Sequence, residues 1–362
     1  MAYLYGRDIK REEIQQSIGN MSQVAGARVY CFDYGKSKGV RAIDVRTGSG
    51  FTFTVLPDRG MDIAYAEFCG KSLAWISKTG IVSSDYHETQ ETGFLRNFFG
   101  GLLTTCGLTQ VGNPCEDSGE KLGLHGRISN TPAEKFHIEK YWDADEYIIN
   151  VKGQVRESFV FKENMVLTRE IICKLGESKL YINDTVENQG YNETPFMILY
   201  HMNFGFPVIS EDTKLMSSCP IIRIESKNAE ANKEKKLCDR FQSPTKGYIH
   251  KSFFHSVPYK KEKVSLALIN ESMEFGLYIS YSPKQLPYLT EWKMLGQQDY
   301  VVGIEPGNCI PEPEGRKGAR DSGRLVILKP GEVRKFSIEI GVLKDKDDII
   351  LYEEKYGNEK VC

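Results

Sequence analysis

Three residues in this sequence have types and settings that suit proton transfer: His125, His201 and Glu305. His125 lies in KLGLHGRIS between two glycines, which allow a sharp backbone turn that presents the imidazole from a loop. His201 ends the apolar run FMILYH, and Glu305 ends the apolar run YVVGIE. Partial burial raises the pKa of a carboxyl group and makes its carboxylate a better base near neutral pH. These residues therefore indicate acid and base chemistry.

Each of the three also has a purely structural explanation, which the sequence leaves open. His125 would then bond a backbone carbonyl within its loop, and His201 would be a hydrogen-bonded core histidine. Glu305 is followed by Pro306-Gly307, so we expect its strand to stop there with the carboxylate at a pocket rim or paired with an arginine.

Two cations are weaker candidates for contact with a ligand. Lys293 lies between Trp292 and Met294 in EWKML, and Arg59 lies in the glycine-containing segment LPDRGMD. Either is equally explained as a surface or ion-pair residue.

Nucleotide and serine-hydrolase motifs are missing from the sequence. GxxxxGK[ST] and GxSxG do not occur, and GRKGARDSG lacks the preceding strand and following helix of a dinucleotide site. We therefore expect chemistry that uses no bound cofactor.

The composition restricts which partners the protein can bind and in which cellular compartment we expect it. The 362 residues carry 47 Lys and Arg against 49 Asp and Glu, so there is no basic excess to neutralise nucleic acid. The first residues contain no apolar signal region, and no segment approaches 18 uninterrupted apolar residues. The nine cysteines contain no C-x-x-C pair and suit a reducing compartment. We expect a cytoplasmic protein without nucleic-acid or membrane partners.

Short segments rich in Val, Ile, Phe, Thr and Tyr, separated by Gly, Asn and Pro, predict antiparallel strands along most of the chain. The predicted strands are 41–46, 51–56, 62–68, 72–76, 147–154, 157–161, 165–175, 179–187, 196–201, 264–270, 275–281, 300–305, 324–328 and 334–343. Without βαβ alternation, this pattern predicts an all-β protein built as one large antiparallel β-sandwich.

Two segments depart from the strand pattern. Residues 1–25 are expected to form a peripheral N-terminal segment, with a short helix over 7–17 that Asp8 caps. Residues 210–262, with SKNAEANKEKK at their centre, are too polar for a core and predict an excursion from the sheet. We expect a single domain over 1–362.

Motifs in a fixed order identify the chain as similar to a known family. LHGR, YHMNFG and GIEPGN resemble the aldose 1-epimerase, or galactose mutarotase-like, superfamily. Together with LPDRGMDI, GFLRNFFGGLLTTCGL and EWKML, they resemble its DUF4432 branch over nearly the whole chain. The resemblance implies a large antiparallel β-supersandwich that holds a sugar in a cleft across one sheet.

The resemblance also implies roles for the three candidate residues. Glu305 matches the catalytic base, His201 the general acid, and His125 the histidine that hydrogen-bonds the ring oxygen. The reaction it implies is cofactor-independent mutarotation: the base deprotonates the anomeric hydroxyl while the acid protonates the ring oxygen, and the steps then reverse.

Substrate contacts are expected from five further residues. Arg127 follows the histidine-glycine pair and suits a hydroxyl or phosphate oxygen, Trp292 suits the apolar face of a pyranose, and Lys293, Arg59 and Asn203 complete the set. Galactose mutarotases commonly carry Asn-Arg before the first histidine, whereas Arg96-Asn97 has the reverse order, as in hexose-6-phosphate epimerase-like proteins. The expected ligand is a monosaccharide or sugar phosphate, and the expected state is a monomer or homodimer.

Two other functions compete with the mutarotase. One is a non-catalytic carbohydrate-binding protein on the same fold, which would keep the same residues for binding. The other is a cupin-like, metal-dependent sugar isomerase with His125, His201, His255 and Glu305 as ligands, although the close H-x-H spacing of such sites is missing.

Overall fold

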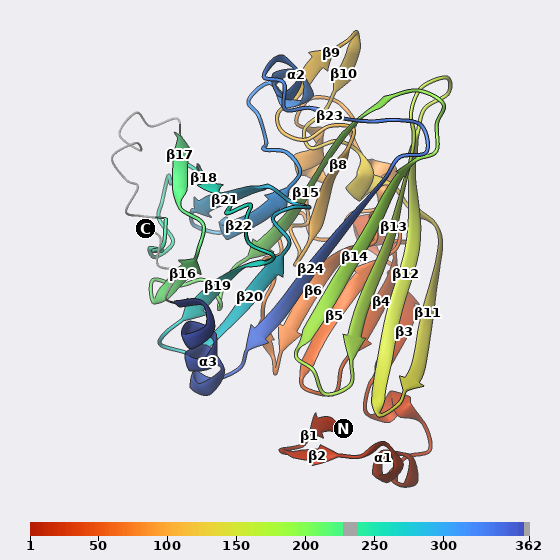
Figure 1. Ribbon diagram of the computed structural model, residues 1–362, viewed down its shortest axis with the longest axis vertical. Coiled ribbons are helices and arrows are strands. Elements are labelled where there is room, and N and C mark those ends of the chain that lie inside the picture. The colour runs from red at the N-terminus through yellow and green to blue at the C-terminus, as the bar shows by residue number, and fades with distance from the viewer. Residues whose placement is uncertain (227–237, 358–362) are drawn as a thin grey trace.

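Antiparallel sheets make up most of the protein (Figure 1), whose computed structural model describes residues 1–226 and 238–357. Most of the long strands lie side by side in an eight-stranded sheet. In order across the sheet, these strands are β11 (Ala133–Asp143), β12 (Glu146–Ser158), β13 (Asn164–Lys174), β14 (Lys179–Asn188), β24 (Val333–Leu343), β20 (Phe275–Tyr281), β19 (Val264–Asn270) and β16 (Thr213–Ser217).

Two further sheets complete the layers. The seven-stranded sheet has the order β17 (Ile221–Ser226), β18 (Lys251–Ser256), β21 (Tyr288–Leu295), β22 (Tyr300–Gly307), β15 (Thr194–Phe204) and β23 (Val326–Leu328), and β8 (Thr104–Leu108) also pairs with β15. The five-stranded sheet contains β3 (Gly26–Cys31), β4 (Arg41–Arg46), β5 (Phe51–Leu56), β6 (Asp62–Phe68) and β7 (Lys71–Ser72).

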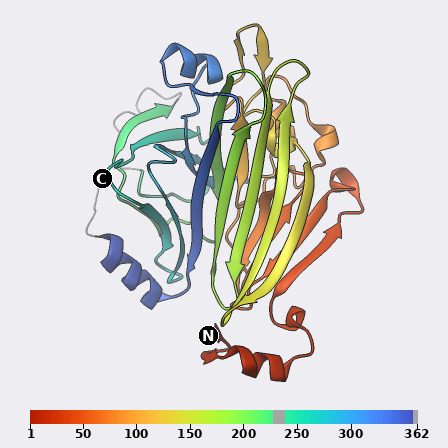
Figure 2. The ribbon, with the colours of Figure 1, turned by 45° about the vertical axis from the view of Figure 1, so that its right-hand side comes forward.

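Small elements lie at the ends of these layers. The hairpin of β1 (Ala2–Leu4) and β2 (Arg7–Ile9) and the helix α1 (Arg11–Ser17) lie beyond one end of the long strands (Figure 2). Their side chains Leu4 and Ile14 still join the main core. At the opposite end lie β9 (Cys115–Asp117), β10 (Glu120–Leu122) and α2 (Gly315–Asp321), whereas α3 (Lys346–Tyr356) packs against β20 and β24.

One apolar core joins all three sheets, and this confirms the predicted all-β sandwich. It contains Ile43 and Phe53 from the five-stranded sheet, Val151 from the eight-stranded sheet, and Tyr200 and Ile304 from the seven-stranded sheet. Burial of apolar surface in this core contributes roughly 25 cal/mol per Å² to the free energy of folding. The described part of the chain contains no helix that is both long and apolar enough to cross a membrane.

A buried ion cluster interrupts this apolar core. The alternation along β14 buries Leu180, Ile182 and Val186, and it also turns Asp184 into the core. Arg169 of β13 meets Asp184 with Nη2 2.7 Å from Oδ2, and it meets Asp62 of β6 with Nη1 3.0 Å from Oδ1.

Two neighbouring side chains complete the hydrogen bonding of the cluster. The Tyr200 hydroxyl donates to Asp184 at 2.8 Å, and the Thr105 hydroxyl donates to Asp62 at 2.6 Å. Tyr200 belongs to β15 and Thr105 to β8. The cluster therefore cross-links all three sheets.

The structure differs from the predicted elements in several places. Residues 147–161 do not form two strands, because β12 runs unbroken to Ser158 and the turn follows it. The N-terminal helix begins at Arg11, and Asp8 lies in β2 opposite Tyr3 and caps nothing. Strand β22 continues through Pro306 to Gly307 and does not stop at Glu305.

The polar segment 210–262 does not leave the sheets entirely. It supplies the edge strand β16 to the eight-stranded sheet and the strands β17 and β18 to the seven-stranded sheet. Its charged centre, SKNAEANKEKK, lies outside the described residues after Ser226. These strands were not predicted because the segment is polar overall; β16 and β17 lie at sheet edges, and β18 lies between β17 and β21.

Substitution of Arg169 by Met tests the role of the ion cluster. The change leaves the carboxylates of Asp62 and Asp184 buried without their cation, and breaking such a pair costs about 3–5 kcal/mol. Urea denaturation should show this loss. The control Lys174→Met, on the same strand, removes an exposed pair with Glu146 and should cost less than about 1 kcal/mol. Equal losses in the two variants would contradict a central role for the cluster.

Candidate active site

Three adjacent strands bring six residues into a two-row array on one face of the seven-stranded sheet. Between β15 and β22, Asn203 is paired with Gly303 and Met202 with Ile304, and the same register sets His201 opposite Glu305. Between β22 and β21, Glu305 is paired with Thr290 and Gly303 with Trp292. The first row is therefore His201, Glu305 and Thr290, and the second row is Asn203, Gly303 and Trp292.

This array lies on the face of the sheet that points away from the main core. Successive side chains of a strand point to opposite faces. Tyr200 and Met202 of β15 and Val302 and Ile304 of β22 all belong to the main core. The residues between them, including His201 and Glu305, therefore project from the other face.

The imidazole of His201 and the carboxyl of Glu305 are in direct contact. Nε2 of His201 lies 3.2 Å from Oε1 of Glu305, and the two side chains are only 7% and 3% exposed. Nδ1 of His201 and Oε1 of Glu305 make no hydrogen bond within the described protein. A buried polar pair with unused hydrogen-bonding capacity is suited to a polar ligand.

A tight loop brings His125 to this pair. The residue has a left-handed backbone with φ of 58°, and Gly126 after it forms a bridge with Gly107 at β8. The amide of Gly112 donates to Nδ1 of His125 at 3.4 Å. The rings of His125 and His201 meet edge to face, with centroids 5.9 Å apart.

Aromatic rings surround the histidines. Phe98 lies 5.3 Å and Trp292 5.6 Å from the ring of His201, and Phe94 lies 5.3 Å from that of His125, measured between ring centroids. Phe98 also contacts Trp75, with ring centroids 6.1 Å apart. Such rings exclude water from charged groups and offer flat apolar surfaces to a ligand.

Burial moves the proton affinities of the central groups in opposite directions. It raises the pKa of Glu305 to about 8, because the carboxylate loses its hydration. Burial lowers the pKa of His125 to about 4, and burial together with the charge of His125 lowers that of His201 to about 3. A carboxylate of high pKa is a strong base, and an imidazolium of low pKa is a strong acid.

Two of the cations proposed from the sequence lie elsewhere. The buried guanidinium of Arg59 donates to the carbonyls of Ser129, Val82 and Asn97 and fixes their loops. Lys293 projects from β21 on the core side, because its neighbour Trp292 faces the array. The geometry therefore does not support substrate contact for either cation.

Buried polar partners hold the Lys293 ammonium in place. Nζ donates to the carbonyls of Cys238 and Arg240 at 2.6 and 2.8 Å, and it lies 3.2 Å from Oε1 of Glu291. These contacts tie the segment around residues 238–240 to β21.

Two of the other expected contact residues, Trp292 and Asn203, adjoin His201. Trp292 contacts His201, and its indole donates to Nδ1 of His250 at 3.2 Å. The Nδ2 of Asn203 donates to the carbonyls of Gly101 and His201, which leaves Oδ1 as an acceptor without a partner. Arg127 follows the His125 loop, but its guanidinium lies 3.5 Å from Glu120.

The ligand set of the cupin-like alternative does not assemble. His255 is on the opposite face of the sheet from Glu305, with Nε2 3.1 Å from Glu291 and Nδ1 2.8 Å from the carbonyl of Cys219. Within residues 1–226 and 238–357, no group of three or more His, Cys, Asp or Glu side chains is arranged to hold a metal ion.

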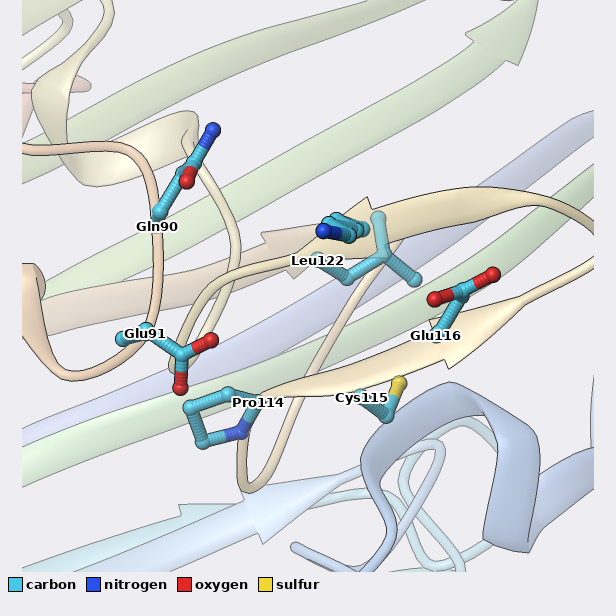
Figure 3. A pocket seen from close by; sticks show the side chains of 7 residues that line it. Gln90, Glu91, Pro114, Cys115, Glu116 and Leu122 are labelled. Carbon is cyan, nitrogen blue, oxygen red and sulfur yellow. The ribbon is translucent and has the colours of Figure 1, made fainter.

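A cavity of about 240 Å³ borders the loop that carries His125 (Figure 3). Gln90 and Glu91 line one side, and Cys115 and Glu116 of β9 line the other. The amide of Leu124, next to His125, donates to the carbonyl of Glu91 at 2.9 Å. The cavity walls therefore help to hold the histidine loop.

The sequence matches the family described as Domain of unknown function (DUF4432) over residues 37–342. The chain belongs to this family. No curated protein matches it at a significant level.

Solved structures resemble this DUF4432 protein over most of its length. A candidate aldose 1-epimerase from Klebsiella pneumoniae is 26% identical, with a TM-score of 0.85 and coverage of 98% of this chain and 92% of that one. A galactose mutarotase-like protein from Clostridium acetobutylicum is 15% identical, with a TM-score of 0.61 and coverage of 88% and 99%. A galactose 1-epimerase from Lactobacillus acidophilus is 14% identical, with a TM-score of 0.55 and coverage of 89% and 99%. The DUF4432 chain therefore has the galactose mutarotase-like fold.

Sequence reasoning missed three residues of the candidate site in this DUF4432 protein. Thr290 was overlooked because β21 was not predicted, although alternation from Trp292 would have placed it on the same face. Gly303 leaves space: a Cβ there would lie 2.5 Å from Oε1 of Glu305 and 3.1 Å from Cε1 of His201. Phe98 lies in the quoted segment GFLRNFFGG, but the one-dimensional sequence gives no sign that it faces His201.

Replacing Glu305 with Gln should change how stability depends on pH. The carboxyl has a pKa of about 8 in the folded protein against an ordinary 4.5, so the folded state binds more protons between these values and loses stability as pH rises through them. The Glu305→Gln variant has no carboxyl at this position, so it does not lose stability in this way as pH rises. Its stability relative to the native protein should therefore increase from pH 5 to pH 9, by at most about 1.4 kcal/mol per pH unit.

Thermal denaturation at pH 5, 7 and 9 measures this effect. Glu139→Gln, at an exposed carboxylate on β11, is the control for loss of a charge. A stability difference for Glu305→Gln that stays constant over this range would show that the carboxyl is not held protonated by burial.

Proposed function

We propose that this protein is a mutarotase that interconverts the anomers of a monosaccharide without a cofactor. The contact between Glu305 and His201, buried and 3.2 Å long, carries the proposal. His125 beside the pair, the surrounding aromatic rings, and the similarity in fold to a galactose mutarotase-like protein and a galactose 1-epimerase support it.

The reaction needs one base and one acid at the anomeric carbon. The Glu305 carboxylate removes the proton of the C1 hydroxyl, the electrons of that O–H bond form the C1 carbonyl, and the bond from C1 to the ring oxygen breaks. The His201 imidazolium delivers its proton to the ring oxygen, and His125 hydrogen-bonds the same oxygen. Rotation about the C1–C2 bond and the reverse transfers close the other anomer.

Glu305 and His201 together carry the same number of protons before and after ring opening. Burial favours the neutral forms of Glu305 and His201, which together hold one proton. Transfer of that proton from the Glu305 carboxyl to the neighbouring His201 imidazole gives the carboxylate and the imidazolium that ring opening requires. Ring opening then returns both groups to their neutral forms, so the solvent supplies no proton.

Removing either group should abolish catalysed anomer exchange. Glu305→Gln and His201→Asn keep much of the side-chain shape but delete the base or the acid, and such groups contribute about 10²–10⁴-fold to rate. Saturation-transfer NMR of aldoses, ketoses and their phosphates would identify the sugar and measure this loss.

A second contact between a histidine and a glutamate provides matched controls. His137 and Glu139 of β11 lie 3.5 Å apart and are about half exposed. His137→Asn and Glu139→Gln should exchange sugars at the native rate. Undiminished exchange in Glu305→Gln would refute the assignment, whereas sugar binding by the native protein without acceleration would indicate a carbohydrate-binding protein.

A further inference from the structure

Thr290 occupies the third position of the first row, on the side of Glu305 away from His201. The register pairs Thr290 with Glu305 directly across β21 and β22. Directly opposed residues of antiparallel strands have Cβ atoms about 4.5–5.5 Å apart on the same face. Thr290 is therefore the neighbour, across the strand pair, of the residue to which the proposed function assigns the proton of the anomeric hydroxyl.

The hydroxyl of Thr290 is buried without a protein partner. The residue is 1% exposed, and Oγ1 makes no hydrogen bond within the described residues. A buried hydroxyl without a partner costs about 1–3 kcal/mol, whereas valine would fill the same space without this cost. The acceptor Oδ1 of Asn203, in the second row, is unpartnered in the same way. Both atoms are suited to the hydroxyl groups of a ligand.

The order of the row matches the order of oxygens around the anomeric carbon of an aldose. C1 carries O1 and lies between the ring oxygen on one side and C2, with its own hydroxyl, on the other. The proposed function places the ring oxygen at His201 and O1 at Glu305. The next group of the sugar, O2, then lies on the side of Thr290.

We propose that the Thr290 hydroxyl binds the C2 hydroxyl of the substrate and selects aldoses that carry it over their 2-deoxy counterparts. This inference rests on the proposed function for the placement of the sugar. It adds a specificity-determining residue that transfers no proton. Threonine suits this role because its hydroxyl both donates and accepts.

The test pairs a change in the protein with a change in the sugar. Thr290→Val removes the hydroxyl and keeps the branched shape, and Thr290→Ser keeps the hydroxyl. Exchange of galactose and 2-deoxygalactose, and of glucose and 2-deoxyglucose, is measured by NMR with the uncatalysed rates subtracted. Circular dichroism and thermal denaturation confirm that each variant is folded.

The expected result is a loss of discrimination. The native protein and Thr290→Ser should prefer the 2-hydroxy sugar, and the preference should fall about five- to tenfold in Thr290→Val, as expected for one hydrogen bond. Nearly all of the fall should come from slower reaction of the 2-hydroxy sugar. An equal loss for both sugars, or an unchanged preference, would overturn the role of Thr290.

Binding measurements separate this inference from the proposed function. The same four sugars are titrated into the native protein and Thr290→Val by calorimetry. If no sugar is exchanged but Thr290→Val loses a preference for 2-hydroxy sugars in binding, the mutarotase fails and the role of Thr290 stands. If none of the four sugars is exchanged or bound, the role of Thr290 is overturned, whereas the mutarotase is decided by the wider panel of aldoses, ketoses and their phosphates.

Discussion

The buried contact of Arg169 with Asp62 and Asp184 constrains the rest of the structure. Two carboxylates at hydrogen-bond distance compensate the buried charge of this guanidinium, and they come from two different sheets. The third sheet joins through the Tyr200 hydroxyl, which donates to Asp184. A shift of one strand by a single residue would leave a charge unpaired in the core.

This constraint fixes the position of His201. Tyr200 must point into the core to reach Asp184, so the next residue along β15 must point out of the opposite face. The register with β22 then brings His201 against Glu305, and the register with β21 adds Thr290. The buried cluster and the candidate active site therefore lie on opposite faces of the same strands, and one strand register positions both.

The fold was largely predictable because most strands are rich in Val, Ile, Phe, Thr and Tyr and are separated by recognisable turns. Residues 41–46, 51–56, 62–68, 264–270 and 275–281 form strands with the predicted bounds. β8 was missed, since its sequence TTCGL lacks alternation and the whole strand is buried. β11 was missed because its mostly exposed sequence AEKFHIEKYWD is rich in charge.

The candidate site was predictable only in part, because some of its residues lie on strands that were not predicted. Residue type and strand context pointed to His201 and Glu305, which the structure brings together. They did not show that Trp292 faces the candidate site and Lys293 the core. Neighbouring residues of a strand point to opposite faces, and β21 was not predicted as a strand. The sequence did not indicate the three carbonyls that Arg59 binds, because only the folded loops bring them to its guanidinium.

The position of Lys293 matters for the chemistry of Glu305. An ammonium beside a buried carboxylate stabilises the charged form and lowers the pKa of the carboxyl. Lys293 instead meets Glu291 on the core side of β21, and burial alone raises the pKa of Glu305. The sheet thus separates a charged network that holds its inner face together from an outer face on which the carboxyl stays weakly acidic. A carboxylate formed there by transfer of its proton to His201 is a strong base, which ring opening requires.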